Sequence, residues 1–326
     1  SLASVNLPAS LNSIGDHAFK DCEALASIDF LGPVASIGDY ALSGCTSLKS
    51  LAIPVAQIGS YVFQDCVNLE TVTLPDPVTS IGDYAFKNCE SLVSIDFPAS
   101  LTAIGKDIFN GCGQLKEIHV AQGNGKFADV DGVLYDKNLS ELLICPKTVT
   151  ELIIPSSVSM IGDNALSGCV SLASVTIPPS VEMIKKQAFS RCTSLSEITL
   201  PASVYFIGEA AFYNCTSLLT INAMRMTPPD TGTDAFRYVP AIAYVYVPKR
   251  TVPLYLASKP WSGFYYYFEV EEWVTGISDI EGDTDRAPQD IYNMQGICIR
   301  RNATQADIDA LPAGLYIIGG KKVYVK

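Results

Sequence analysis

Cysteine is the residue whose placement most strongly suggests chemistry in this chain, because thiolates bind metals, attack electrophiles and form disulfides. Eight of the 10 cysteines recur at spacings of 23, 21, 23, 23, 57, 23 and 23 residues, namely Cys22, Cys45, Cys66, Cys89, Cys112, Cys169, Cys192 and Cys215. Such a series predicts stacked side chains about 4.8 Å apart, with parallel Cα–Cβ vectors that do not face each other as a disulfide requires. We therefore predict buried thiols, with pairing of some neighbours as the alternative. No C-x-x-C pair suggests a metal site, and Cys145 and Cys298 lie outside the series.

A second repeated group is the Asp of the sequence I-G-D, found at Asp16, Asp39, Asp83 and Asp163. A ladder of carboxylates could bind Ca²⁺, which prefers oxygen ligands. Glu209 continues the series, but Ser60 and Lys106 interrupt it. An Asp before a short helical turn commonly accepts hydrogen bonds from the N–H groups of that turn. We therefore predict helix N-caps and no metal ligands.

Catalytic groups are sparse in the sequence. An enzyme needs a nucleophile, a base and a charge-stabilising group within reach of one another, but the only histidines, His17 and His119, lie about five repeats apart. No G-x-S-x-G, H-E-x-x-H, P-loop or dinucleotide motif occurs. We predict no enzyme activity, no catalytic residue and no cofactor. The net charge of −12 argues against nucleic acid and anionic lipid as partners, and no run of 18 apolar residues predicts a membrane span.

The elements that hold these residues follow from a period of about 23 residues, L-x-x-Φ-x-Φ-P-x-x-Φ-x-x-I-G-x-x-A-F-x-x-C, where Φ is apolar. A period of this length is typical of a solenoid of stacked units. In the first unit, Val5 and Leu7 alternate as in a short strand that a proline ends, and residues 11–14 form a second extended piece. We expect Gly15 to supply a turn and a helical turn to follow. The predicted fold class is an α/β repeat solenoid with a small C-terminal β unit.

Departures from the period divide the chain. The third repeat lacks two residues between Pro54 and Ile58, and the 57-residue interval contains Lys126–Pro146, which predicts two strands around Asp136-Lys137-Asn138 as an inserted hairpin. We assign residues 1–273 to the solenoid, with an aromatic cap at 237–273, residues 274–290 to a linker, and residues 291–326 to a small β domain. Gly319-Gly320 predicts a hairpin within that domain.

Aromatic residues are dense between Tyr255 and Trp273. A solenoid must close its open end, so we expect these residues to form the cap, with a ligand platform as the alternative.

A binding surface is expected where strand side chains point away from the core. Ser and Thr are the most frequent residues in its two outward columns, which gives a flat polar surface that over most of its length lacks the aromatic or Arg anchors on which interfaces depend. A solvated face without a partner is the simpler interpretation. Anchors occur at the C-terminal end, and the inserted segment lies beside the face. The candidate partner-binding residues are Tyr244, Tyr246, His119, Glu117, Glu151 and Lys137.

The repeats resemble the BspA-like leucine-rich repeats of bacterial surface proteins. The resemblance rests on lines such as Ile81–Cys89, I-G-D-Y-A-F-K-N-C, and on the insert Asp131–Asp136, D-G-V-L-Y-D. The tail, with Tyr292–Gly296, is similar to sorting-type β segments of exported proteins. The resemblance implies an extracellular or cell-surface location and adhesion to, or binding of, a host or microbial macromolecule, with protein as the first partner class. A carbohydrate-binding or purely structural surface component is the alternative.

Overall fold

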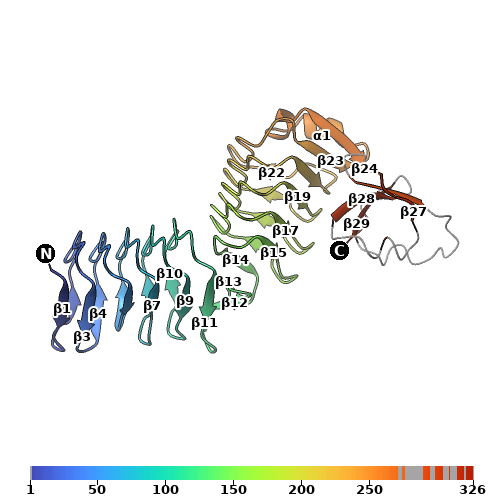
Figure 1. The fold of residues 1–326 in the computed structure, drawn as a ribbon. Coiled ribbons are helices and arrows are strands. Elements are labelled where there is room, and N and C mark those ends of the chain that lie inside the picture. The colour runs from blue at the N-terminus through green and yellow to red at the C-terminus, as the bar shows by residue number, and fades with distance from the viewer. Residues whose placement is uncertain are drawn as a thin grey trace.

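The computed structural model describes residues 2–270, 274–275, 289–293, 298–303, 308, 314–318 and 321–325. The chain winds into rungs whose strands form two stacks around a common core (Figure 1). The front strands are β1 (Ser4–Leu7), β3 (Ser27–Phe30), β5 (Ser50–Ala52), β7 (Thr71–Thr73), β9 (Ser94–Phe97), β11 (Glu117–Val120), β15 (Glu151–Ile153), β17 (Ser174–Thr176), β19 (Glu197–Leu200), β21 (Thr220–Ala223), β23 (Tyr244–Pro248) and β24 (Tyr266–Val270). The back strands are β2 (Ser13–Ile14), β4 (Val34–Ile37), β6 (Val55–Ile58), β8 (Ser80–Ile81), β10 (Ala103–Ile104), β16 (Met160–Ile161), β18 (Met183–Ile184), β20 (Phe206–Ile207) and β22 (Asp230–Thr231).

The rungs repeat with the predicted register. Neighbouring strands pair in parallel, with Val5 opposite Ile28 on the front and Ile14 opposite Ile37 on the back. The same apolar positions of each rung therefore stack in the core. The rings of Phe63 and Phe86, for example, lie parallel with centroids 5.2 Å apart. The prediction of a solenoid with units of about 23 residues is confirmed.

The glycine of I-G-D permits the close approach of successive rungs. A Cβ atom at Gly105 would lie 2.3 Å from the backbone nitrogen of Asp83, and one at Gly82 would lie 2.6 Å from the carbonyl carbon of Gly59. Neither glycine, nor Gly15, has a positive φ. A turn does follow this glycine, but what the position requires is the absence of a side chain and not a left-handed backbone.

The α/β class predicted from sequence is also wrong. His17 and Asp21 have φ values of 59° and 57°, so the turn that follows the back strand cannot be an α-helix. Its N–H groups alternate between two kinds of acceptor: Lys20 donates to the His17 carbonyl within the turn, whereas Phe19 donates to the Ala41 carbonyl of the next rung. In an α-helix, these N–H groups would instead donate to carbonyl groups of the same helix. The fold is a nearly all-β solenoid, and its described part contains two short helices, α1 (Val252–Leu256) and the 3-10 helix η1 (Trp261–Gly263).

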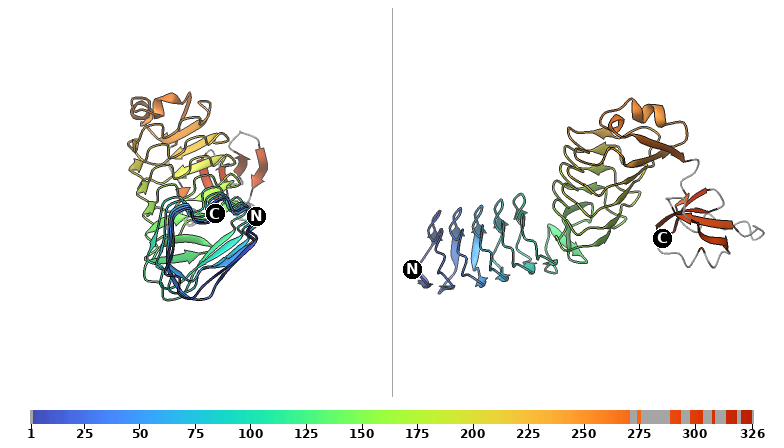
Figure 2. Two further views of the ribbon diagram at one scale, coloured as in Figure 1. Left: turned by 90° about the vertical axis from the view of Figure 1, so that its left-hand side faces the viewer. Right: turned by 45° about the horizontal axis from the view of Figure 1, so that its top comes forward.

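The inserted segment divides the solenoid into a first arm, residues 2–120, and a second arm, residues 151–270, which meet at an angle (Figures 1 and 2). Three antiparallel strands form the junction, namely β12 (Phe127–Val130), β13 (Val133–Asp136) and β14 (Glu141–Ile144), one more than predicted. Side chains alternate across β13, so Leu134 joins the core of the first arm while Val133 and Tyr135 join that of the second. The molecule therefore has two hydrophobic cores with β13 between them.

The C-terminal aromatic region contains both buried and exposed rings. Tyr255 and Trp261 are fully buried against the last rung, and Trp261 lies 4.9 Å from Phe236 between ring centroids. Tyr266 and Phe268 remain 47% and 43% exposed on β24. Trp273 lies outside the described residues.

The C-terminal strands form a separate sheet in the order β25 (Val274–Thr275), β29 (Lys321–Val325), β28 (Gly314–Ile318), β26 (Gln289–Asn293), β27 (Cys298–Ala303). The hairpin partners β28 and β29 pair antiparallel as predicted. Strand residues 274–275 and 289–290 begin and end the segment assigned to a linker. In the described part of the chain, no helix has the length and apolarity needed to cross a bilayer.

Candidate binding surface

The cysteine ladder holds the rungs together. Cys66 Sγ donates to the Leu42 carbonyl at 3.2 Å and Cys89 Sγ to the Phe63 carbonyl at 3.1 Å, so each thiol satisfies an acceptor of the preceding rung. All nine cysteines with described side chains are free thiols. Burial raises the pKa values of Cys45, Cys112 and Cys215 to about 12. At neutral pH these thiols are therefore protonated and lack the thiolate needed for nucleophilic attack.

Cys145, which the sequence left unassigned, occupies the place that Phe has in other rungs. Its N–H donates to the Ala165 carbonyl at 2.8 Å, as the N–H of Phe63 donates to the Ala85 carbonyl. Its side chain is fully buried in the core of the second arm. Cys145 is therefore part of the stacked core, although its spacing of 24 residues to Cys169 does not fit the period of the cysteine series.

The I-G-D carboxylates do not cap their own turns, and this prediction is wrong. Asp16 Oδ1 accepts the N–H of Asp39 at 2.9 Å, and Asp83 Oδ1 accepts the N–H of Lys106 at 2.8 Å, each one rung further along. Because the residue after each Asp turns into the left-handed region, the turn presents no helical N–H groups to its own carboxylate. Within the described residues, no three His, Cys, Asp or Glu side chains converge as metal ligands.

The two histidines lie on different surfaces. His17 stacks on Tyr40 with ring centroids 5.1 Å apart and begins a row of rings that continues through Tyr61 and Tyr84 along the turns. His119 lies on β11, where its Nε2 is 3.0 Å from Glu117 Oε2 and both side chains are at least half exposed. The geometry offers no shared site for the two imidazoles.

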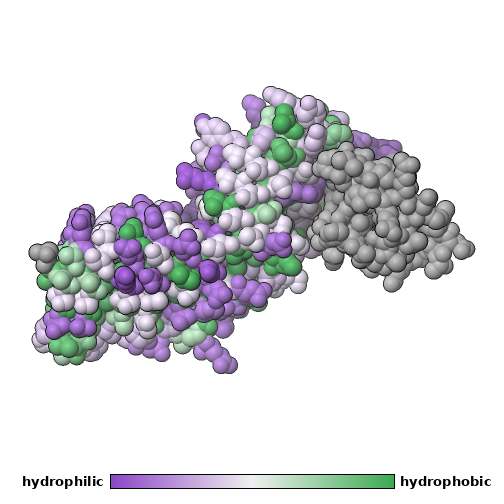
Figure 3. All heavy atoms as spheres, viewed as in Figure 1, coloured by the Kyte–Doolittle hydropathy of each residue, from purple (hydrophilic) through white to green (hydrophobic). Residues whose placement is uncertain are grey.

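The front face, which we define as the outward side of the front strands, carries two columns of side chains. Ser and Thr are the most frequent residues in these columns, and the space-filling view shows polar and apolar residues interspersed along the molecule (Figure 3). Glu117, His119, Glu151 and Tyr244 are exposed in these columns, whereas Tyr246 is not. Lys137 is exposed between β13 and β14, outside the front strands.

An aromatic platform, consisting of Tyr244, Tyr246, Tyr266 and Phe268, occupies the C-terminal end of this face. Parallel pairing of β23 with β24 sets Tyr244 beside Tyr266 and Tyr246 beside Phe268, with ring centroids 5.6 Å and 5.2 Å apart. Tyr246 is only 7% exposed because Phe268 stacks on it, so its prediction as a free contact residue is wrong. Burial, Tyr244 and Glu197 all raise its pKa. Tyr266 and Phe268, which belong to the aromatic stretch considered as a cap or a ligand platform, are exposed beside it.

A polar network borders the platform on β19 and β21. Asn222 lies opposite Tyr246 in the register, and its Nδ2 donates to Glu197 Oε1 at 2.6 Å and to Thr199 Oγ1 at 3.2 Å. Asn222 is 1% exposed. The strand beside the rings is therefore fixed by both backbone pairing and side-chain hydrogen bonds.

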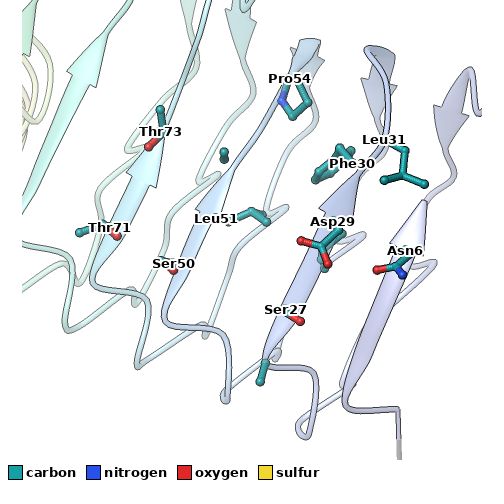
Figure 4. Close-up of a pocket in the computed structure, with 13 residues that line it drawn as sticks. Asn6, Ser27, Asp29, Phe30, Leu31, Ser50, Leu51, Pro54, Thr71 and Thr73 are labelled. Carbon is teal, nitrogen blue, oxygen red and sulfur yellow. The ribbon is translucent and has the colours of Figure 1, made fainter. Parts of the chain in front are cut away.

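A groove of about 770 Å³ crosses the front face near the N-terminal end (Figure 4). Its lining comes from the first four front strands and the segments that follow them. Figure 4 shows Ser27, Ser50 and Thr71 toward one end of the strands, and an apolar lip of Phe30, Leu31 and Pro54 toward the other, where Thr73 also lies. Asp29 points outward between them. No candidate selected from the sequence lies here.

The candidate residues thus form separate groups. Glu117 and His119 contact each other on β11, and Tyr244 packs in the aromatic platform on β23 and β24. Glu151 lies on β15 at the start of the second arm, and Lys137 lies at the junction. The structure brings Tyr244 and Tyr246 together and Glu117 and His119 together, and it places Glu151 and Lys137 apart from both pairs.

The geometry described so far defines a class of protein, a repeat solenoid with free buried thiols and one long exposed strand face. Comparison with known proteins gives the family: the model of the BspA type leucine rich repeat region matches six copies over residues 1–116 and 137–255, so the chain belongs to this family. No curated protein matches the chain.

Solved structures share the fold. A leucine-rich repeat protein from Eubacterium ventriosum is 29% identical with a TM-score of 0.61, covering 76% of this chain and 66% of that one. A leucine rich cell surface protein from Faecalibacterium prausnitzii is 25% identical with a TM-score of 0.56, covering 74% and 70%. The pneumococcal vaccine antigen PcpA has a TM-score of 0.64 at 20% identity, covering 83% and 80%, and shows the fold alone.

Proposed function

We propose that this protein is displayed on a bacterial surface or secreted, and that it binds a host or microbial protein through its front face as an adhesion protein. Membership of the BspA-type family supports this proposal, as does the likeness to a leucine rich cell surface protein. The fold supports it further, because solenoids present extended surfaces that bind macromolecules.

The observation that carries the proposal is the aromatic platform at the end of a Ser- and Thr-rich face. Tyr244 and Tyr266 are 45% and 47% exposed on rigid strands. Exposed tyrosines give a large contact area at low cost in side-chain entropy, and small polar residues around them give adaptable hydrogen bonds, a combination that protein-binding surfaces use. We propose Tyr244, Tyr266 and Phe268 as the anchors.

The charged candidates would flank these anchors in the complex. Glu117, His119 and Glu151 lie along the front face, and Lys137 lies beside it at the junction. Exposed charges of this kind affect association rate and partner choice more than affinity. We propose no enzymatic role, since in the described residues the two histidines lie apart and burial raises the pKa values of the Cys45, Cys112 and Cys215 thiols to about 12.

The test is capture of partners by the intact protein from host and microbial extracts, compared with the double variant Tyr244→Ala, Tyr266→Ala. Loss of two anchor side chains should weaken capture about 30-fold or more, since truncation of an interface hot spot costs about 2 kcal/mol. Tyr205→Ala is the matched control, because Tyr205 is 42% exposed but lies outside the front strands.

Equal capture by the double variant and the control would contradict the platform as the binding site. Capture of glycans without any protein would contradict the partner class, and failure to capture either would favour a purely structural component.

A further inference from the structure

The groove on the first arm has its origin in the third rung. Val34 pairs with Val55 and Ile37 with Ile58, so the residues equivalent to Gly32 and Pro33 are missing after Pro54. The third rung consequently makes a shorter connection from its front strand to its back strand than its neighbours do. The front ladder is also interrupted here, since β3 pairs only with β1 and β5 only with β7 among the described strands.

The floor of this groove is unusually low because its central side chain is small. Ala52 occupies the outward column between Asp29 on β3 and Thr73 on β7. On one side of Ala52, the second rung exposes Leu31, a large aliphatic residue that is 65% exposed. Phe30 and Pro54 extend this apolar lip (Figure 4). The depression therefore offers an apolar wall against which a partner's side chain can be desolvated.

One charged group lies in the groove. Asp29 is exposed and has no ion-pair partner among the described residues, and neither Lys nor Arg lines the groove. The remaining polar side chains are neutral, namely Asn6, Ser27, Ser50, Thr71 and Thr73. A ligand that covers this surface must supply a cation for the carboxylate, because burying an unpaired charge is costly.

We infer that the groove is a second contact site, which binds an extended segment of a protein partner carrying Lys or Arg two residues from an aliphatic or aromatic residue. Asp29 and Leu31 are two residues apart in sequence, about 7 Å along an extended chain, and a segment with the basic-x-apolar pattern projects both side chains from one face at the same spacing. The basic group pairs with Asp29, and the apolar side chain fills the space above Ala52 against Leu31.

This inference rests on the proposed function and adds to it a partner chemistry at a site in the other arm. The test begins with selection of a random-peptide phage library on the intact protein. The expected consensus is basic-x-apolar. The selected peptide is then synthesised and titrated against variants by fluorescence anisotropy.

Asp29→Asn should weaken binding about two- to fivefold, the range measured for exposed ion pairs. Ala52→Phe, which fills the depression from an outward strand position, should weaken binding tenfold or more. Asp96→Asn is the matched control, because β9 has the same sequence, Ser-Ile-Asp-Phe, as β3 but lies outside the groove, and it should leave binding unchanged.

The inference is overturned if no peptide is enriched, if the consensus lacks a basic residue, or if Asp96→Asn weakens binding as much as Asp29→Asn. Thermal unfolding of each variant separates loss of the site from loss of the fold. Capture of partners from extracts through the aromatic platform would stand in any of these cases, so failure of the groove site is distinguishable from failure of the proposed function.

Discussion

Replacement of Phe86 by Ala tests whether the two cores are energetically separate. Phe86 is fully buried in the first arm, between Phe63 at 5.2 Å and Phe109 at 5.7 Å. Removal of a buried phenyl ring costs about 3–5 kcal/mol. Among the described residues, the two cores are in contact at the junction strands β12, β13 and β14, so we expect the loss of stability to be confined to the first arm.

Hydrogen exchange followed by mass spectrometry measures this loss segment by segment, because exchange of core amides reports the free energy of opening. Since 1.4 kcal/mol corresponds to a factor of ten, protection of β5, β7 and β9 should fall by about a hundredfold to several thousandfold. Protection of β17, β19 and β21 should change little.

The matched variant is Phe189→Ala in the second arm, where Phe189 is fully buried and stacks on Phe212 at 5.1 Å. It should give the opposite pattern, with loss of protection in the second arm alone. Equal loss in both arms for either variant would show that the solenoid unfolds as one cooperative unit. The reasoning from two cores would then be refuted.

Three further predictions concern the rungs and the junction. Gly105→Ala should destabilise the first arm by about 1–3 kcal/mol or more, as at other overpacked sites, because its Cβ atom would overlap the backbone of Asp83. Gly113→Ala, which has open space around it, should leave stability unchanged. Urea unfolding compares the two variants, and equal midpoints would contradict the argument from close approach. Iodoacetamide at pH 8 should leave Cys45, Cys112 and Cys215 unmodified until the protein is unfolded, since their pKa values near 12 keep them protonated; peptide mass spectrometry locates the label, and rapid labelling of any of these three residues in the folded protein would contradict the prediction. Burial raises the pKa of Asp136, but hydrogen bonds from Ser140 and Glu141 outweigh it and lower the pKa. The carboxylate therefore stabilises the junction at pH values above its unfolded pKa, and this contribution is lost as pH falls through the lowered folded pKa. Asp136→Asn should remove this part of the acid dependence of unfolding measured by circular dichroism, and an unchanged pH profile would contradict the assignment.

The candidate site was predictable only in part. The sequence pointed to the end of the front face that carries the aromatic platform, because Tyr244 stands where most other rungs have Ser or Thr. It could not distinguish Tyr246, which alternation places outward but which Phe268 covers. The groove had a sequence signal in the 21-residue spacing of the third repeat. Its consequence required knowing which neighbouring connections remain long.

The sequence by itself determined the period, the two strands of each rung, the apolar core positions and the stacked cysteines, because each of these depends on residue types recurring at a fixed spacing. Only the tertiary structure decided the partners of the I-G-D carboxylates and the reason for the adjacent glycine. Asp83 bonds the N–H of Lys106, and Gly105 has no side chain because the backbone of Asp83 occupies that space. Both effects act between rungs, across 23 residues of sequence, where a pattern within one repeat carries no information about distance.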